Sequence, residues 1–145
     1  MKDLTNRVAI VTGSSSGVGA ATARLLAAQG CHVVINYNSN AEGAEQVSAD
    51  CEAAGAETLV LQANVANDED CVAMAQAAHE KWGRVDALVN NAGTTKFVDH
   101  DKLEGLSAED FQRIYSVNVV GAYQMTRAVS PCLLYTSDAA DDLYR

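Results

Sequence analysis

Residues 8–19 read VAIVTGSSSGVG, and this stretch decides the fold. Residues 7–12 form a continuous run rich in β-branched side chains, which is typical of a strand buried on both faces. The run breaks into glycines and serines, and residues 18–29 (VGAATARLLAAQ) then favour a helix that ends at Gly30. The stretch therefore predicts a strand, a glycine-rich turn and a helix.

The same alternation recurs along the chain. Strands are predicted at 31–37 and 57–65, a fourth strand with its exit loop at 84–93, and helices at 41–55, from near Asn67, and from Ser107 toward Pro131. Helical spacing places two sets of side chains against a sheet: Ala44, Val47, Cys51 and Ala54, and then Cys71, Met74, Ala75, Ala78 and Trp82. Alternating strands and helices predict right-handed crossovers and an α/β fold, a doubly wound parallel sheet covered on both faces.

Length and charge restrict the classes of function. The 145 residues suffice for one domain or part of one. A net charge of -9 with scattered Lys and Arg argues against a nucleic-acid partner. No secretory leader is recognisable at the start, and no apolar run is long enough to span a membrane, so we expect a soluble, cytoplasmic protein without a membrane partner.

The four cysteines offer little chemistry. Cys31, Cys51, Cys71 and Cys132 form no C-x-x-C pair and have no His at ligand spacing. Neither a metal site nor a disulfide framework is therefore expected, and the cysteines are interpreted as small core residues.

The glycine-rich turn is a candidate ligand site. In a doubly wound sheet, ligands lie beyond the carboxyl ends of the strands, where the turn after the first strand is also found. Gly13 can supply the sharp turn, Gly17 a close backbone approach to a pyrophosphate, and Gly19 tight helix packing, with the serines as further donors. The spacing differs from the dinucleotide fingerprint G-x-G-x-x-G, so an ordinary flexible loop remains an alternative.

A second motif favours the ligand site. Asn90-Asn91-Ala92-Gly93 ends the fourth predicted strand, and with residues 12–19 (TGSSSGVG) it resembles the N-N-A-G and T-G-x-x-x-G-x-G motifs of the short-chain dehydrogenase/reductase family. The resemblance covers residues 4 to about 131, and the 3-oxoacyl-[acyl-carrier-protein] reductase branch is the nearest in character. It implies a Rossmann-type sheet with strand order 3-2-1-4, truncated here after the fourth strand and the helix that follows.

The resemblance also implies a set of cofactor-binding residues. They are Gly13, Ser14, Ser15, Ser16, Gly17, Val18 and Gly19 around the pyrophosphate and adjacent ribose; Asn36, Tyr37, Asn38 and Ser39 after the second strand; Asn64 and Val65 at the adenine; and Asn91, Ala92 and Gly93 along the cofactor path. Many family members have Asp in place of Asn64, but an amide offers both a donor and an acceptor.

The end of the second strand bears on which cofactor is used. NAD enzymes present a carboxylate to the ribose 2′-hydroxyl there, whereas the sequence NYNSN (36–40) carries no acid before Glu42. The Arg or Lys that often accompanies a 2′-phosphate is missing as well. We expect NADP to be preferred and NAD to be the alternative.

Asn118 is the one candidate catalytic residue. Phe111, Ile114, Ala122, Met125 and Val129 are expected on one buried helical stripe, with Asn118 in its middle. An unpaired buried amide costs about 1 to 3 kcal/mol, so a partner is expected. The surrounding SVNVVGAY resembles the family's helix that bears the catalytic Asn of a proton relay. The alternative is a core amide that only fixes packing.

The family's other catalytic residues, a Ser, a Tyr and a Lys, are absent. The nearest match to Tyr-x-x-x-Lys is Tyr123 with Arg127, and helical angles turn both away from Asn118. The resemblance implies hydride transfer between a nicotinamide and a small carbonyl or secondary-alcohol substrate, such as a 3-oxoacyl, keto or sugar compound, in relatives that are commonly homotetramers. We expect the 145-residue chain itself to be inactive.

The end of the chain departs from this pattern. We assign residues 1–131 to the N-terminal part of an NAD(P)-binding domain and residues 132–145 to a non-native tail, because CLLYTSDAADDLYR looks like adapter read-through joined to a truncated gene. A genuine short variant is the alternative. For function, a non-catalytic NAD(P)-binding module and a structural fragment without a ligand stay open beside the oxidoreductase.

Overall fold

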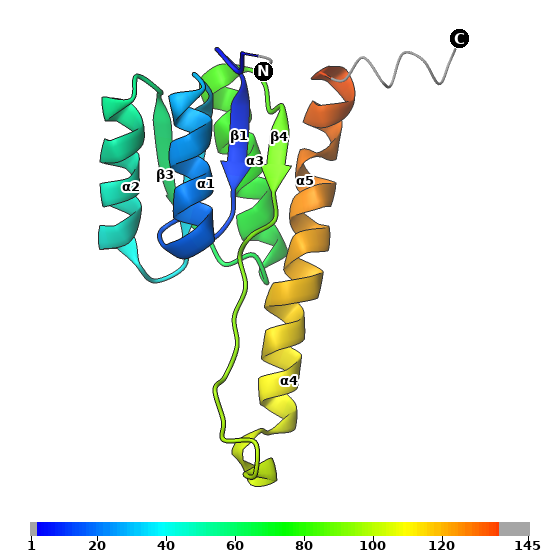
Figure 1. The fold of residues 1–145 in the computed structure, drawn as a ribbon. Coiled ribbons are helices and arrows are strands. Elements are labelled where there is room, and N and C mark those ends of the chain that lie inside the picture. Colours follow the sequence, from blue (N-terminus) through cyan, green and yellow to red (C-terminus); the bar gives the residue numbers. More distant parts are fainter. Residues whose placement is uncertain (1–2, 137–145) are drawn as a thin grey trace.

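The computed structural model describes residues 3–136 (Figure 1). Its strands are β1 (Val8–Val11), β2 (His32–Tyr37), β3 (Thr58–Gln62) and β4 (Ala87–Val89). They form one sheet in the order β3-β2-β1-β4, and every pairing is parallel. The predicted α/β class, the parallel sheet and its strand order are confirmed.

Helices cover both faces of the sheet. The helices are α1 (Gly17–Ala28), α2 (Ala41–Ala53), α3 (Asp68–Trp82), α4 (Ala108–Tyr115) and α5 (Gly121–Thr136), with the 3₁₀ turn η1 (Leu103–Gly105) and the π-helix η2 (Ser116–Val120). α1 and α2 lie on one face, and α3 and α5 on the other (Figure 1). α4 extends past the end of the sheet. None of the helices in the described part of the chain is long and apolar enough to cross a membrane.

The core follows the hydrophobic pattern of the sequence. All four residues of β1 are completely buried, as a central strand covered on both faces requires. Two apolar clusters lie on the two faces of the sheet, one against α1 and α2 and the other against α3 and α5. Cys31, Cys51 and Cys71 are buried as predicted, whereas Cys132 is half-buried.

Two predicted buried positions lie at helix ends and are exposed to different degrees. Ala54 is exposed because α2 ends at Ala53 and Ala54 is its C-cap. Trp82, the last residue of α3, packs only partly against the core. The helical spacing was correct for the remaining members of both sets, which are buried.

Trp82 belongs to a polar and aromatic cluster at the amino-terminal ends of β2 and β3. Its ring stacks on His32 with 5.8 Å between centroids and 5° between planes. Its indole N–H donates to the Glu57 carboxylate at 2.7 Å, and the Glu57 backbone N–H donates to His32 Nδ1 at 3.0 Å. This cluster holds the start of the sheet against the end of α3.

The last helical segment differs from the prediction. A single regular helix was expected from Ser107 toward Pro131, but the π-helix η2 interrupts it, and α5 continues through Pro131 to Thr136. A π-turn inserts an extra residue, so a count of 100° per residue fails across it. Met125 and Val129 are buried as expected, whereas Phe111 is 65% exposed.

The predicted boundary at residue 131 therefore falls inside a helix. Residues 132–136 of the proposed tail continue α5, and residues 137–145 lie outside the described part of the chain. The assignment of 132–145 as a non-native tail stays a prediction.

Candidate functional site

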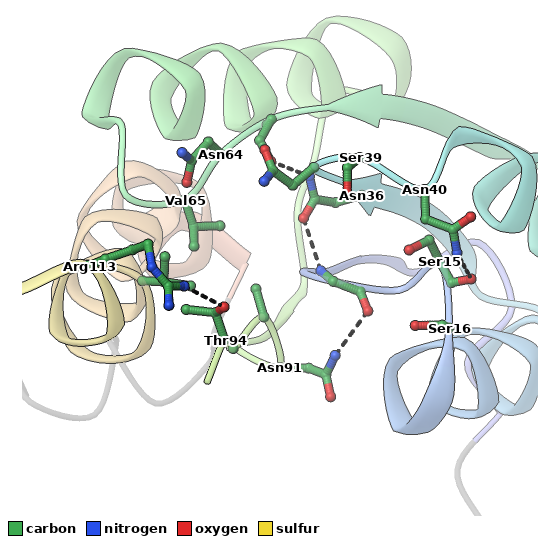
Figure 2. Close-up of a pocket in the computed structure, with 16 residues that line it drawn as sticks. Ser15, Ser16, Asn36, Ser39, Asn40, Asn64, Val65, Asn91, Thr94 and Arg113 are labelled. Atoms are coloured by element: carbon green, nitrogen blue, oxygen red, sulfur yellow. Dashed lines mark hydrogen bonds between the residues drawn. The ribbon is translucent and has the colours of Figure 1, made fainter. Parts of the chain in front are cut away.

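A cleft of 530 Å³ opens at the carboxyl ends of the strands (Figure 2). The lining residues come from the end of β2, from the loops after all four strands, and from α4 and η2: Gly13, Ser15, Ser16, Asn36, Asn38, Ser39, Asn40, Ala63, Asn64, Val65, Asn91, Ala92, Gly93, Thr94, Arg113 and Val117. Most residues that the sequence predicted for a cofactor are brought together here. Ser14, Gly17, Val18, Gly19 and Tyr37 are not among the described residues that line the cleft.

The glycine-rich turn is held tightly against the loop after β4. Gly13 has a φ of +63°, and a Cβ there would lie 2.9 Å from the Ala92 Cα. A Cβ on Gly19 would lie 2.4 Å from the Asn91 Nδ2 and 2.6 Å from the Gly13 carbonyl oxygen. Real Cβ atoms do not approach other atoms so closely, so the two loops can meet in this way only with glycine at both positions.

Thr12 and Asn91 join the same two loops through hydrogen bonds. The backbone N–H groups of Asn91 and Ala92 both donate to Thr12 Oγ1 at 3.0 Å. The Asn91 side-chain amide donates to the carbonyls of Thr12 at 2.9 Å and Gly13 at 3.1 Å. The carboxamide of the NNAG motif is therefore used to fix the floor of the cleft.

The three serines of the turn have different surroundings. Ser14 is completely buried, and its hydroxyl donates to the Val11 carbonyl at 2.7 Å. Ser15 and Ser16 line the cleft (Figure 2). Ser16 is the N-cap of α1, yet its side chain makes no capping bond, in contrast to Asn40, Asn67 and Ser107, which cap α2, α3 and α4.

The first turn of α1 therefore lacks the side-chain cap that would accept its N–H groups. Such free donors, together with the helix dipole, form an anion-binding position. Gly17, with φ +55°, leaves open space where a Cβ would stand, so a ligand can approach its backbone closely.

The loop after β2 carries amides and a hydroxyl. Asn38, Ser39 and Asn40 are exposed and line the cleft. The Asn40 side chain accepts the Gly43 N–H at 3.1 Å and donates to the Ser15 carbonyl at 3.4 Å, so this loop lies against the glycine-rich turn. Among the described lining residues, Arg113 is the one charged side chain and none is a carboxylate.

The exit of β3 supplies another wall. Val65 is buried, while Asn64 is exposed and its Oδ1 accepts the Ala66 N–H at 3.0 Å. The Asp70 carboxylate accepts the Asn64 backbone N–H at 2.8 Å. Strand β3 ends at Gln62, earlier than predicted, so both residues lie in a loop whose shape α3 fixes.

Asn118 has the partner that its sequence context demanded. Its Oδ1 accepts the Thr94 N–H at 2.8 Å, and its Nδ2 donates to the Thr94 carbonyl at 3.0 Å. The expectation that Asn118 lies in a buried stripe is wrong, because the residue is exposed in η2, where the helical register changes. Tyr123 is 63% exposed, and Arg127 pairs with Asp68, so neither lines the cleft.

The loop of residues 94–107 is also fixed to the start of α4. Arg113 donates to Thr94 Oγ1 at 3.0 Å, and Lys96 pairs with Asp110 at 2.7 Å. The Lys96 hydrogen bond, helped by Ser107, lowers the pKa of Asp110 to about 2. Asp110 also forms a capping box with Ser107 at the start of α4.

Sequence reasoning missed five lining residues: Asn40, Ala63, Thr94, Arg113 and Val117. Thr94 directly follows the NNAG motif. Arg113 and Val117 come from a helix end that approaches the cleft only in three dimensions, so no local motif indicates them. Among residues 3–136 no group of three or more His, Cys, Asp or Glu side chains is placed to hold a metal ion.

Comparisons with known proteins agree with this geometry. The sequence pattern of the short chain dehydrogenase family matches residues 7–140. The chain is 41% identical over 134 residues to a 3-oxoacyl-[acyl-carrier-protein] reductase of Synechocystis, covering 92% of this chain and 53% of the relative. It is 36% identical over 129 residues to glucose 1-dehydrogenase 2 of Bacillus subtilis, covering 88% of this chain and 48% of the relative.

A solved structure gives the same result. A short chain dehydrogenase from Burkholderia cenocepacia, crystallised in complex with NADP, superimposes with a TM-score of 0.85 at 35% identity, covering 91% of this chain and 53% of that one. The chain therefore belongs to the short chain dehydrogenase family, whose members are oxidoreductases. It spans about half the length of the relatives that it matches.

Proposed function

We propose that this chain is the cofactor-binding half of an NADP-dependent short-chain oxidoreductase. The observation that carries the proposal is the start of α1, beside the cleft. The Ser16 side chain makes no capping hydrogen bond there, so its hydroxyl and the first helical N–H groups can bind a ligand. This arrangement fits the pyrophosphate of a dinucleotide. The described residues that line the cleft include one cation and no carboxylate, which suits such a polyanion.

The residues around the cleft fit the rest of the cofactor as well. Val65 offers an apolar surface and Asn64 an amide for the adenine. Gly93 and Thr94 lead from the turn toward Asn118, along the expected path of the nicotinamide end. When bound, the nicotinamide supplies the hydride that is exchanged with a carbonyl or secondary alcohol.

NADP is the preferred cofactor in this proposal. Asn38, Ser39 and Asn40 provide hydrogen-bond donors where an NAD enzyme carries a carboxylate. The 2′-phosphate then meets no repulsion, although no Lys or Arg of this loop neutralises it. NAD remains the alternative.

Asn118 keeps capacity for a proton relay. A carboxamide has two donor and two acceptor positions, and Thr94 uses one of each. The remaining positions can hold a water or a lysine, as the family pattern implies. The substrate is a small carbonyl or alcohol compound, in keeping with relatives named as a 3-oxoacyl reductase and a glucose dehydrogenase.

The chain by itself binds the cofactor without turnover in this proposal, because it lacks the family's Ser, Tyr and Lys. The face of α4 and η2 that carries Phe111, Tyr115 and Val119, exposed by 65%, 59% and 48%, is suited to subunit contacts in a full-length homotetramer. A non-catalytic NAD(P)-binding module is the alternative function.

Calorimetric titration of the 145-residue chain with NADPH and NADH tests the proposal. We expect NADPH to bind more tightly than NADH, and no NADPH oxidation when a 3-oxoacyl thioester is added. Tighter NADH binding would overturn the cofactor preference, and the absence of binding to either would overturn the proposed function. A chimera of residues 1–131 with the second half of the Synechocystis reductase then separates the two functions, because only the oxidoreductase regains turnover.

A further inference from the structure

Asn36 is a buried amide under the floor of the cleft. It lies near the end of β2 and is 2% exposed, and it follows Val33, Val34 and Ile35, which are completely buried and apolar. A central strand needs no carboxamide for its own packing. An amide at this depth is stable only when its polar atoms are bonded.

Every polar atom of Asn36 has a partner. Its Oδ1 accepts the Gly13 N–H at 2.9 Å, and its Nδ2 donates to the carbonyls of Ala63 at 3.2 Å and Leu61 at 3.3 Å. Its backbone N–H donates to Ser14 Oγ, and its carbonyl accepts the Ser14 N–H, both at 2.9 Å. These bonds run from β2 to both neighbouring loops.

The two loops form opposite parts of the cleft. Gly13 begins the glycine-rich turn, and Ala63 directly precedes Asn64 and Val65. In Figure 2 the Asn36 side chain lies between them, with dashed bonds to each side. The Asn36 side chain thus links the glycine-rich turn to the loop after β3. Its oxygen and its nitrogen both bond to backbone groups of the protein.

We propose that Asn36 is a positioning residue for the nucleotide, acting through Gly13 and Ala63. It fixes the separation of the two walls and orients the turn before a ligand arrives. The sequence predicted Asn36 as a cofactor contact. In the structure its side chain is buried and bonds the loops that carry the predicted cofactor contacts. The identity of the ligand rests on the proposed function, but the effect of Asn36 on the conformation of the glycine-rich turn does not.

The test compares Asn36→Leu with Thr58→Val. Thr58 is a matched control because it is also a buried polar residue of this sheet, bonded to Ser48 at 2.6 Å and Glu52 at 2.8 Å. It lies at the amino-terminal end of β3, whereas the cleft is at the carboxyl end. Both variants leave buried groups without partners and lower the free energy of unfolding. Only the first disturbs the glycine-rich turn.

Hydrogen exchange of the ligand-free chain gives the first readout. We expect exchange of the Gly13 and Ser14 amides in Asn36→Leu to accelerate by about tenfold more than exchange of β2 core amides such as Val34. Thr58→Val should show no such excess. Equal acceleration at all amides in Asn36→Leu, or the same excess in Thr58→Val, would overturn the proposal.

NADPH titration gives the second readout. Asn36→Leu should raise the Kd by about tenfold and Thr58→Val by less than about twofold. If the wild-type chain does not bind NADPH, the proposed function fails while hydrogen exchange still decides the role of Asn36.

Asn36→Asp replaces the leucine variant if that one does not fold. An ionised carboxylate accepts from Gly13 but repels the Leu61 and Ala63 carbonyls, whereas a protonated one can donate to Ala63. The ratio of Gly13 amide protection in Asn36→Asp to that in the wild type should therefore rise as the pH is lowered from about 8 to about 5. A ratio that does not change with pH would contradict the proposal. Asn67→Asp, at the exposed cap of α3, controls for the added charge.

Discussion

Asn118 and Thr94 are joined at two points, with the side-chain amide of one bonded to both the backbone N–H and the carbonyl of the other, at 2.8 and 3.0 Å. The carboxamide satisfies both backbone polar groups of Thr94. It fixes the loop that follows β4 against the π-helix η2.

Removing this amide should loosen the loop of residues 94–107. Asn118→Ala loses two partly exposed hydrogen bonds, together worth about 1 kcal/mol, so amide exchange in the loop should rise by about fivefold. Gln112→Ala, an exposed substitution on α4, is the control and should leave the loop unchanged. Exchange equal in the two variants would show that Thr94 does not depend on Asn118.

Gly19→Ala should damage the cleft more than the helix. The added Cβ would meet the Asn91 Nδ2 and the Gly13 carbonyl oxygen, and the backbone carbonyl cannot yield freely. We expect a loss of about 1 to 3 kcal/mol in the free energy of unfolding, measured in urea, and a Kd for NADPH raised by about tenfold or more. Ala21→Ser, on the exposed side of α1, should change neither quantity markedly, and wild-type affinity in Gly19→Ala would refute the packing argument.

Asn38→Asp should reverse the expected cofactor preference. A carboxylate at this exposed position repels a 2′-phosphate and can accept a ribose 2′-hydroxyl. The ratio of the Kd values for NADPH and NADH should rise by about tenfold, while Asn67→Asp, which adds the same charge outside the cleft, leaves it unchanged. An unaltered ratio in Asn38→Asp would place the 2′-position elsewhere.

The buried thiols should resist modification and weaken the fold in alkali. Burial raises the pKa of Cys31 and of Cys71 from 9.0 to about 11 and also raises that of Cys51. At about pH 8 a disulfide reagent should label none of these three until guanidinium is added, whereas half-buried Cys132 reacts in the folded chain. Rapid labelling of native Cys132→Ser would contradict this assignment.

The sign of the pH effect follows from the same shifts. Between pH 9.0 and about 11 the unfolded chain loses thiol protons that the folded chain keeps, so the thiols favour unfolding increasingly as pH rises through this range. Their stabilising contribution is complete below pH 9.0. Urea titrations at several alkaline pH values measure the decline, and Cys31→Ala should reduce its slope.

Local patterns predicted the elements whose neighbours are close in sequence. The apolar run before Gly13 identified β1, and the acidic first turn after Asn67 identified the start of α3, because both signals act over a few residues. The meeting of the turn with NNAG followed from strand order, since the exits of β1 and β4 adjoin in a parallel sheet.

Tertiary contacts decided what these patterns missed. The π-turn at Asn118 has no propensity signal and alters the face of every later helical residue. Phe111 is exposed because α4 extends past the end of the sheet, whereas Met125 is buried where α5 packs against the sheet. Arg113 reaches the cleft through the path of the whole loop after β4, which no spacing rule describes.

The stacked pair of Trp82 and His32 gives the chain an optical property of its own. Trp82 is the single tryptophan of the sequence, and it lies at the amino-terminal end of the sheet, opposite the cleft. Its intrinsic fluorescence should therefore follow the docking of α3 on the sheet and not direct contact with a nucleotide. Folding can then be followed by the indole fluorescence and ligand binding by the fluorescence of the reduced nicotinamide, both in the same sample.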